Sequence, residues 1–142
     1  MNKINNITIE HIKYIAHQLA VQTMSWDEPI PEFNTRQPNI LESCIATPFQ
    51  KFNKQFLYKG LSGKVAILFY LLIKNHPFQN GNKRIAVTTL LIFLALNKKW
   101  LKTNTTELYN VARWVAASPP EAKKEVVEYI EKFIGKRIFN FS

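Results

Sequence analysis

The stretch HPFQNGNKR, His76–Arg84, lies between two long apolar runs and decides the fold. The run before it is LSGKVAILFYLLIKN (Leu61–Asn75), and the run after it is IAVTTLLIFLALN (Ile85–Asn97). Both runs place apolar residues on nearly every side of a helix, and such a helix has to be buried. The sequence therefore predicts two central helices, the first capped by Ser62, with a polar loop joining them inside the core.

The apolar spacing elsewhere also favours helices. Thr8–Thr23 has helical periodicity, and NILESCIATP (39–48) predicts a short helix stopped by Pro48. Towards the end of the chain, we expect a helix capped by Thr105 or Thr106 and another that restarts at SPPE (118–121) and ends at Gly135.

Two segments lack this periodicity. WDEPIPEFNTRQPN (26–39) is rich in turn-forming residues and is predicted to be an irregular connection. FQKFNKQFLYKG (49–60) interleaves aromatic with polar residues, which is typical of a loop or a small hairpin with an exposed edge. The expected fold class is thus all-α, a helical bundle with a small flap.

Length and composition limit the kind of protein. A chain of 142 residues that is 46% hydrophobic suits a single domain, residues 1–142. Its one cysteine, Cys44, cannot form an internal disulfide, which fits a reducing compartment. The first residues, MNKINNITIE, hold no apolar signal segment, and the apolar runs are shorter than the roughly 20 residues of a membrane span. We expect a soluble, cytoplasmic protein with no membrane partner.

The net charge of +9 favours anionic partners, since 19 Lys and Arg face 10 Asp and Glu. The basic residues are scattered along the chain, whereas a nucleic-acid interface needs them clustered on one face. Binding to nucleic acid is therefore unlikely, although it remains an alternative supported by the charge alone.

The loop HPFQNGNKR has the composition of an anion site. The first backbone N–H groups of the following helix have no partner within the helix and carry the positive end of its dipole. Gly81 allows a close backbone approach, and Asn82, Lys83 and Arg84 add an amide and two cations. His76 precedes them and can take a proton from an attacking hydroxyl, so the pattern indicates phosphoryl or nucleotidyl transfer.

Each of these residues also has a structural interpretation. His76 can simply end a helix, and Lys83 with Arg84 can be a solvated pair. Phe78 is interpreted wholly as a hydrophobic anchor that holds the loop between the two helices. The functional interpretation is preferred because a plain connection between buried helices does not need two asparagines, a glycine and two cations in one loop.

HPFQNGNKR resembles the signature loop of the Fic/Doc family, His-x-Phe-x-(Asp or Glu)-(Gly or Ala)-Asn-(Gly or Lys)-Arg. Nearly the whole chain resembles the death-on-curing branch of this family. The similar segments are NILESCIATP before the flap and the two apolar runs on either side of the signature. It implies a Fic/Doc-like helical bundle that binds a nucleotide such as ATP together with Mg²⁺.

The resemblance also implies a role for each position of the loop. His76 is the general base for a Ser, Thr or Tyr hydroxyl of a target protein. Gly81 and Asn82 hold phosphate oxygens, Lys83 adds phosphate binding, and Arg84 binds phosphate and stabilises charge in the transition state. Residues 49–58 take the place of the flap, where a target segment adds as an extra strand.

The sequence departs from the family pattern at two positions. Asn80 stands where the family has the acidic ligand of Mg²⁺, and a neutral amide binds the metal more weakly. Val87 stands where adenylylating members have a second arginine, an absence that death-on-curing toxins share together with lysine at position 83.

These features favour a death-on-curing-like toxin that transfers phosphate from ATP to elongation factor Tu or a similar translation protein. The family's self-inhibitory pattern has no good copy, because Thr103–Glu107 is followed by Leu108, so a separate and acidic antitoxin is expected. Two alternatives stay open: a Fic-type adenylyltransferase, and a catalytically weakened nucleotide- or protein-binding member because of Asn80.

Overall fold

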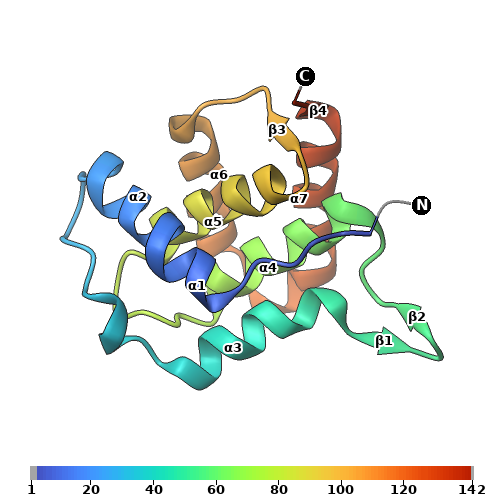
Figure 1. Ribbon diagram of the computed structural model, residues 1–142, viewed down its shortest axis with the longest axis horizontal. Helices are drawn as coiled ribbons and strands as arrows, with labels where there is room; N and C mark the ends of the chain where they lie inside the picture. The colour runs from blue at the N-terminus through green and yellow to red at the C-terminus, as the bar shows by residue number, and fades with distance from the viewer. Residues whose placement is uncertain (1–2, 142) are drawn as a thin grey trace.

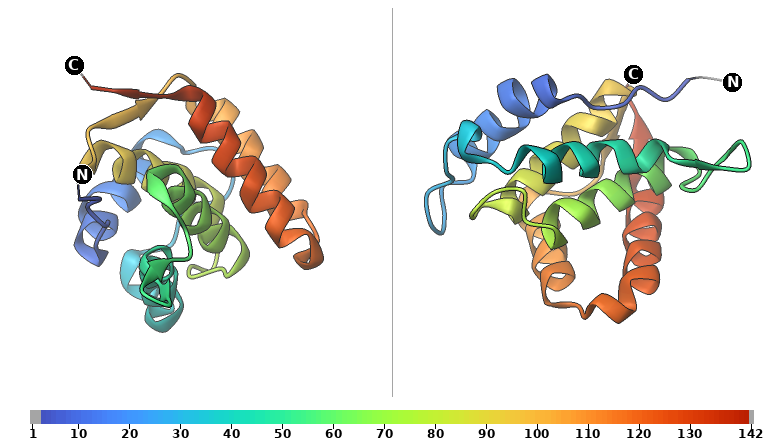
Figure 2. Two further views of the ribbon diagram at one scale, coloured as in Figure 1. Left: turned by 90° about the vertical axis from the view of Figure 1, so that its right-hand side faces the viewer. Right: turned by 90° about the horizontal axis from the view of Figure 1, so that it is seen from below.

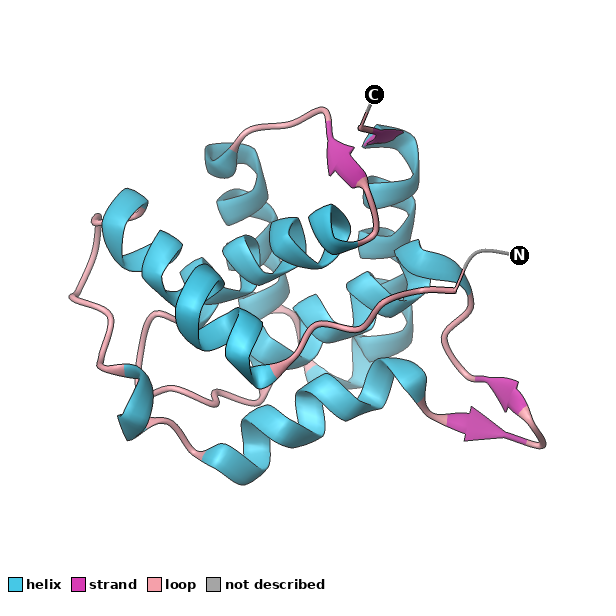
Figure 3. Cartoon of the chain, viewed as in Figure 1, coloured by secondary structure: helices cyan, strands magenta, loops and turns pink. Residues whose placement is uncertain are grey.

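Helices make up most of the chain in the computed structural model, which describes residues 3–141 (Figure 3). The prediction of an all-α fold is confirmed. The helices are α1 (Ile9–His11), α2 (His17–Thr23), α3 (Pro38–Ala46), α4 (Gly60–Lys74), α5 (Asn82–Leu96), α6 (Thr105–Ala117) and α7 (Lys123–Arg137).

α4 and α5 lie at the centre of the molecule (Figure 1). α4 packs against α5 and α7, and α5 packs against α6. Every residue from Gly63 to Ile73 is buried, as is every residue from Arg84 to Leu91. Both central helices are therefore enclosed on almost all sides, as their composition predicts. No helix within residues 3–141 combines the length and the apolar character that crossing a membrane requires.

The first predicted helix runs from Ile9 to Thr23, but it is not α-helical throughout. A π-helical turn, Ile12–Ala16, separates α1 from α2. The hydroxyl of Thr8 accepts a hydrogen bond from the backbone N–H of His11 and caps the start of the helix. Thr88 of α5 donates to the carbonyl of Ala16 at 2.8 Å, which ties the π-helical turn to the centre of the fold.

The flap is a short antiparallel hairpin of β1 (Lys51–Phe52) and β2 (Gln55–Phe56), which extends away from the helices (Figure 2). Lys64 of α4 attaches it to the core. The ammonium of Lys64 donates to the carbonyl of Tyr58 at 2.5 Å and lies 3.9 Å from the centre of the Phe56 ring. Burial lowers the pKa of this lysine.

A second sheet was not predicted from the sequence. β3 (Lys99–Leu101) pairs antiparallel with β4 (Ile138–Asn140), with Leu101 opposite Ile138. The paired residues of the two strands are close to 40 positions apart along the chain, so no local turn motif predicts their pairing. The sheet closes the bundle by joining the end of α5 to the end of α7 (Figure 1).

Two predicted helix starts were wrong by a few residues. α4 begins at Gly60 rather than beside Ser62, which lies within its first turn. Asn104, and not Thr105 or Thr106, caps α6, because its side-chain oxygen accepts from the N–H of Glu107 at 2.8 Å.

The predicted end of the last helix was also wrong. α7 continues through Gly135 to Arg137. A glycine inside a helix costs about 1 kcal/mol relative to alanine, and the burial of Phe133 and Ile134 directly before it outweighs this cost. The chain then passes without a break into β4.

Candidate active site

The loop between α4 and α5 is fixed by α3 as well as by the helices that it joins. α4 ends at Lys74, and α5 starts at Asn82. The backbone N–H of Gln37, directly before α3, donates to the carbonyl of Pro77 in the loop at 2.8 Å. The loop therefore has a defined conformation next to the start of α5.

Phe78 and Asn82 fill the inner side of the loop. Phe78 is 1% exposed and packs against the rings of His17 and Phe33. The side-chain oxygen of Asn82 accepts from the N–H of Phe78 at 2.9 Å, and its Nδ2 donates to the carbonyl of Phe78 at 2.8 Å. Both polar atoms of the Asn82 side chain are thus hydrogen-bonded to the backbone of Phe78. A phosphate would therefore be bound by the backbone N–H of Asn82 and not by its side chain.

The start of α5 has the free backbone donors that an anion site requires. The first backbone bond within the helix runs from the N–H of Ile85 to the carbonyl of Gly81 at 2.9 Å, so the N–H groups of residues 82–84 have no helical partner. No side chain among residues 3–141 caps this end. These N–H groups and the helix dipole attract a negatively charged group.

Gly81 is required by the backbone and by packing. Its φ of 77° is in the left-handed region, which side chains disfavour. A Cβ at this position would lie only 2.9 Å from Cγ1 of Ile30. The glycine therefore allows the loop to pack against Ile30 while it turns into α5.

The two cations of the loop have different environments. Lys83 is half-buried, and its ammonium has no hydrogen bond or ion pair within the described part of the chain. Arg84 is 2% exposed and donates to the carbonyls of Met24 at 3.2 Å, Trp26 at 2.8 Å and Glu28 at 2.5 Å. An arginine has five N–H donors, so the backbone takes up most of them and leaves the others for a ligand.

His76 is exposed at the rim of the same site, with a φ of 51°. Its Nδ1 lies 3.4 Å from Nδ2 of Asn82, whose orientation is fixed by Phe78. In this contact the amide of Asn82 is the donor, which leaves the proton of the neutral ring on Nε2. A general base that acts through Nε2 requires the other tautomer, so that role would require the ring to release this contact.

These side chains meet around one pocket of about 200 Å³. Ligand pockets for whole small molecules measure roughly 300–1,000 Å³, so this volume suits the phosphate groups of a nucleotide. The pocket collects all six residues that the sequence predicted for chemistry or binding: His76, Asn80, Gly81, Asn82, Lys83 and Arg84.

A sequence model of the Fic/DOC family matches residues 6–94, which include the whole pocket loop and the helices on both sides of it. The chain belongs to the Fic/DOC family. Comparisons with curated proteins and with solved structures gave no match. The family match thus covers α1 to α4 and α5 as far as Leu94, and α6 and α7 lie outside it.

Two acidic residues that the sequence interpretation missed also line the Fic/DOC pocket, Asp27 and Glu28. Nδ2 of Asn80 donates to a carboxylate oxygen of Glu28 at 3.4 Å, although 52 positions separate them. The other amide atom, Oδ1 of Asn80, is buried and has no hydrogen-bond partner in the described part of the chain. The sequence around Asp27 and Glu28 contains no motif that predicts a place in the pocket. They reach it because the hydrogen bonds of Arg84 to the backbone hold their loop there, which is a long-range contact.

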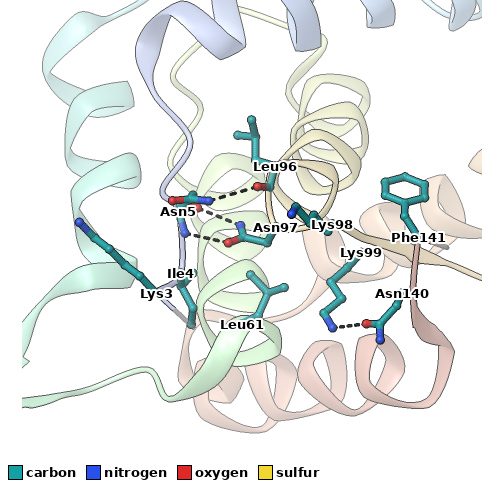
Figure 4. A pocket seen from close by; sticks show the side chains of 10 residues that line it. All are labelled: Lys3, Ile4, Asn5, Leu61, Leu96, Asn97, Lys98, Lys99, Asn140 and Phe141. Carbon is teal, nitrogen blue, oxygen red and sulfur yellow. Dashed lines mark hydrogen bonds between the residues drawn. The ribbon is translucent and has the colours of Figure 1, made fainter. Parts of the chain in front are cut away.

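A larger cavity of about 740 Å³ lies away from the Fic/DOC loop, between the first described residues and the β3–β4 sheet (Figure 4). Asn5 and Asn97 hydrogen-bond across it, which fixes Asn5 to the end of α5. Among the described residues, its charged lining residues are Lys3, Lys98 and Lys99, and none of its lining residues is a histidine, a cysteine or a carboxylate. It therefore lacks the groups for acid–base or nucleophilic chemistry.

Proposed function

We propose that this Fic/DOC protein transfers the γ-phosphoryl group of ATP to a serine or threonine hydroxyl of a target protein. The observation that carries the proposal is the pocket at the start of α5, where Lys83 and His76 line the same space and the first backbone N–H groups of the helix have no helical partner. Anion-binding groups and a base thus lie around one space whose volume suits phosphate groups.

In the proposed step, the target hydroxyl oxygen attacks the γ-phosphorus. The bond from this phosphorus to the β–γ bridging oxygen breaks, and ADP leaves with that oxygen. Nε2 of His76 accepts the hydroxyl proton. The N–H groups of residues 82–84, Lys83 and the free donors of Arg84 stabilise the negative charge on the phosphoryl oxygens.

The residues present can hold the Mg²⁺ that this chemistry uses. Asn80 and Glu28 both line the pocket, and the carboxylate of Glu28, together with Oδ1 of Asn80 once its amide has turned over, would be the oxygen ligands. Mg²⁺ typically takes only one or two protein ligands beside substrate phosphates and water, so the lack of a larger acidic cluster within residues 3–141 does not exclude it. When bound, the metal neutralises charge on the phosphates.

The choice of phosphate transfer over adenylyl transfer rests on two positions. Val87 is fully buried in α5, so no second arginine reaches the pocket from there. Lys83 replaces the alternative glycine of the signature, as in the death-on-curing branch. We therefore propose a death-on-curing-like toxin that acts on elongation factor Tu or a similar translation protein, with adenylyl transfer as the alternative.

The surface supports a protein target and a separate antitoxin. The flap ends in an exposed edge, on which Phe52 is 68% exposed, and an extended target segment can add to it as a strand. The net charge of +9 favours an acidic antitoxin.

The test is to incubate the purified protein with Mg²⁺, elongation factor Tu and ATP labelled on the γ or the α phosphate. Label from the γ position supports phosphoryl transfer, and label from the α position supports adenylyl transfer. His76→Ala should abolish labelling. His11→Ala is the matched control, because His11 lies in the cap of α1, away from the pocket. Full labelling by His76→Ala would contradict the role of His76.

A further inference from the structure

Glu28 lies where a metal ligand is missing. Asn80 replaces the acid of the family signature, and the side chain that contacts Asn80 is the carboxylate of Glu28, at 3.4 Å. We infer that Glu28 supplies the anionic ligand for the divalent cation of this pocket, in partnership with Asn80. This inference rests on the proposed function, which requires a cation beside the phosphates.

The backbone of Glu28 is held in place by the core of the protein. Buried Arg84 donates to the carbonyls of Met24, Trp26 and Glu28 itself. Further along the same segment, His17 bonds to the carbonyl of Pro31 at 2.8 Å. The carboxylate thus extends from an anchored backbone, and it does not have to be brought to the pocket from a free loop.

The amide of Asn80 indicates a missing partner. Its Nδ2 points to Glu28, while its Oδ1 is buried and unpartnered. A buried acceptor without a partner is destabilising. A half-turn of the amide would point Oδ1 at the Glu28 carboxylate, and two acceptor oxygens tolerate each other at that distance when a cation lies between them.

The spacing of the two groups fits this arrangement. Neighbouring oxygens of an octahedral Mg²⁺ lie about 3 Å apart, because each is about 2.1 Å from the metal. The distance of 3.4 Å between Nδ2 of Asn80 and the Glu28 carboxylate is close to this value, and Oδ1 would take the place of Nδ2 after the half-turn of the amide. The half-turn and a small further movement would bring both oxygens onto one cation.

The charges around the pocket explain why a carboxylate is needed there. Lys83 and Arg84 repel a divalent cation, and Asn80 adds no negative charge. Within residues 3–141, Glu28 and Asp27 are the two carboxylates that line the pocket, and Glu28 is the one with a hydrogen bond to Asn80. Asp27 therefore serves as the matched control: it has the same charge, on the neighbouring residue of the same loop.

The test measures Mn²⁺ binding by electron paramagnetic resonance, with Mn²⁺ alone and with Mn²⁺ plus a non-hydrolysable ATP analogue. Glu28→Gln should weaken Mn²⁺ binding about tenfold or more. Asp27→Asn should change it by no more than about threefold, since it alters only the surrounding field. Asparagine tolerates the left-handed φ of 72° at position 27, so the control keeps the backbone. Asn80→Asp in the Glu28→Gln background should restore binding.

The inference is overturned if the unchanged protein binds no Mn²⁺ in either condition, or if Glu28→Gln weakens binding no more than Asp27→Asn does. These outcomes differ from a failure of the proposed function. A protein that transfers phosphate while Glu28→Gln retains Mn²⁺ refutes only the role of Glu28. A protein whose Mn²⁺ depends on Glu28 but which transfers no phosphate refutes only the proposed function.

Discussion

Replacing Gly81 with alanine tests how the loop is built. The φ of 77° at this position costs an alanine about 1–2 kcal/mol. The new Cβ would also lie 2.9 Å from Cγ1 and 3.3 Å from Cγ2 of Ile30, well inside the ordinary carbon–carbon contact of about 3.5–4.0 Å. Overpacking of this kind costs about 1–3 kcal/mol. The expected loss of unfolding free energy is therefore about 2–5 kcal/mol.

The assay is urea unfolding followed by circular dichroism, with linear extrapolation of the free energy of unfolding to water. Gly135→Ala is the matched control, because Gly135 lies inside α7 and a Cβ there has no neighbour within 4 Å. This control should gain about 0.5–1 kcal/mol, since alanine favours the helix. The two glycine-to-alanine changes should thus have opposite signs.

A variant that lacks the Ile30 side chain separates the backbone strain at position 81 from the steric contact with Ile30. Ile30→Ala removes the two nearest atoms, Cγ1 and Cγ2, and leaves Cβ of Ile30 at 3.4 Å, an ordinary contact, so Gly81→Ala in that background should cost only the backbone part, about 1–2 kcal/mol. A cost of Gly81→Ala below about 1 kcal/mol, or an equal cost in both backgrounds, would refute the stated reason for glycine at this position.

Three further predictions concern other parts of the molecule. Burial raises the pKa of Cys44 from 9.0 to about 11, so the thiol of the unfolded chain ionises first as the pH rises. The stability advantage of the unchanged protein over Cys44→Ala should therefore shrink by about 2 kcal/mol between about pH 8 and pH 10.5. A difference in urea unfolding that does not depend on pH would contradict this. Lys64→Met removes the hydrogen bond to Tyr58 and the contact with the Phe56 ring, so hydrogen exchange in residues 51–58 should accelerate. The control Lys59→Met should leave the exchange rates unchanged. Equal rates in the two variants would exclude Lys64 as the anchor of the flap. Asn80→Asp should bind Mn²⁺ more tightly than the unchanged protein in the resonance assay, and no gain would argue against metal binding at position 80.

The sequence predicted the central part of the fold because the signal there is strong and local. The apolar residues of α4 and α5 identify buried helices without reference to any other segment. Helix ends were predicted less well, since Ser62, Thr105 and Gly135 are compatible with a cap or a stop, and tertiary packing decides which residue acts. The β3–β4 sheet was missed because it forms between distant segments.

The candidate site divides in the same way. Residues 76–84 are contiguous, so their chemistry could be inferred as a unit from the sequence. The acids of the pocket could not, because Glu28 reaches Asn80 only through the fold. The same holds for Arg84, whose sequence position suggests phosphate binding but whose guanidinium mainly bonds to the backbone of residues 24–28. In both cases, the missing information is a long-range contact.

The most direct test of the central claim is the intact mass of elongation factor Tu after incubation with the protein, ATP and Mg²⁺. The account predicts a mass gain of one phosphoryl group, present with His11→Ala and absent with His76→Ala. A gain of one adenylyl group, or a gain that persists in His76→Ala, would contradict phosphoryl transfer by the pocket at the start of α5.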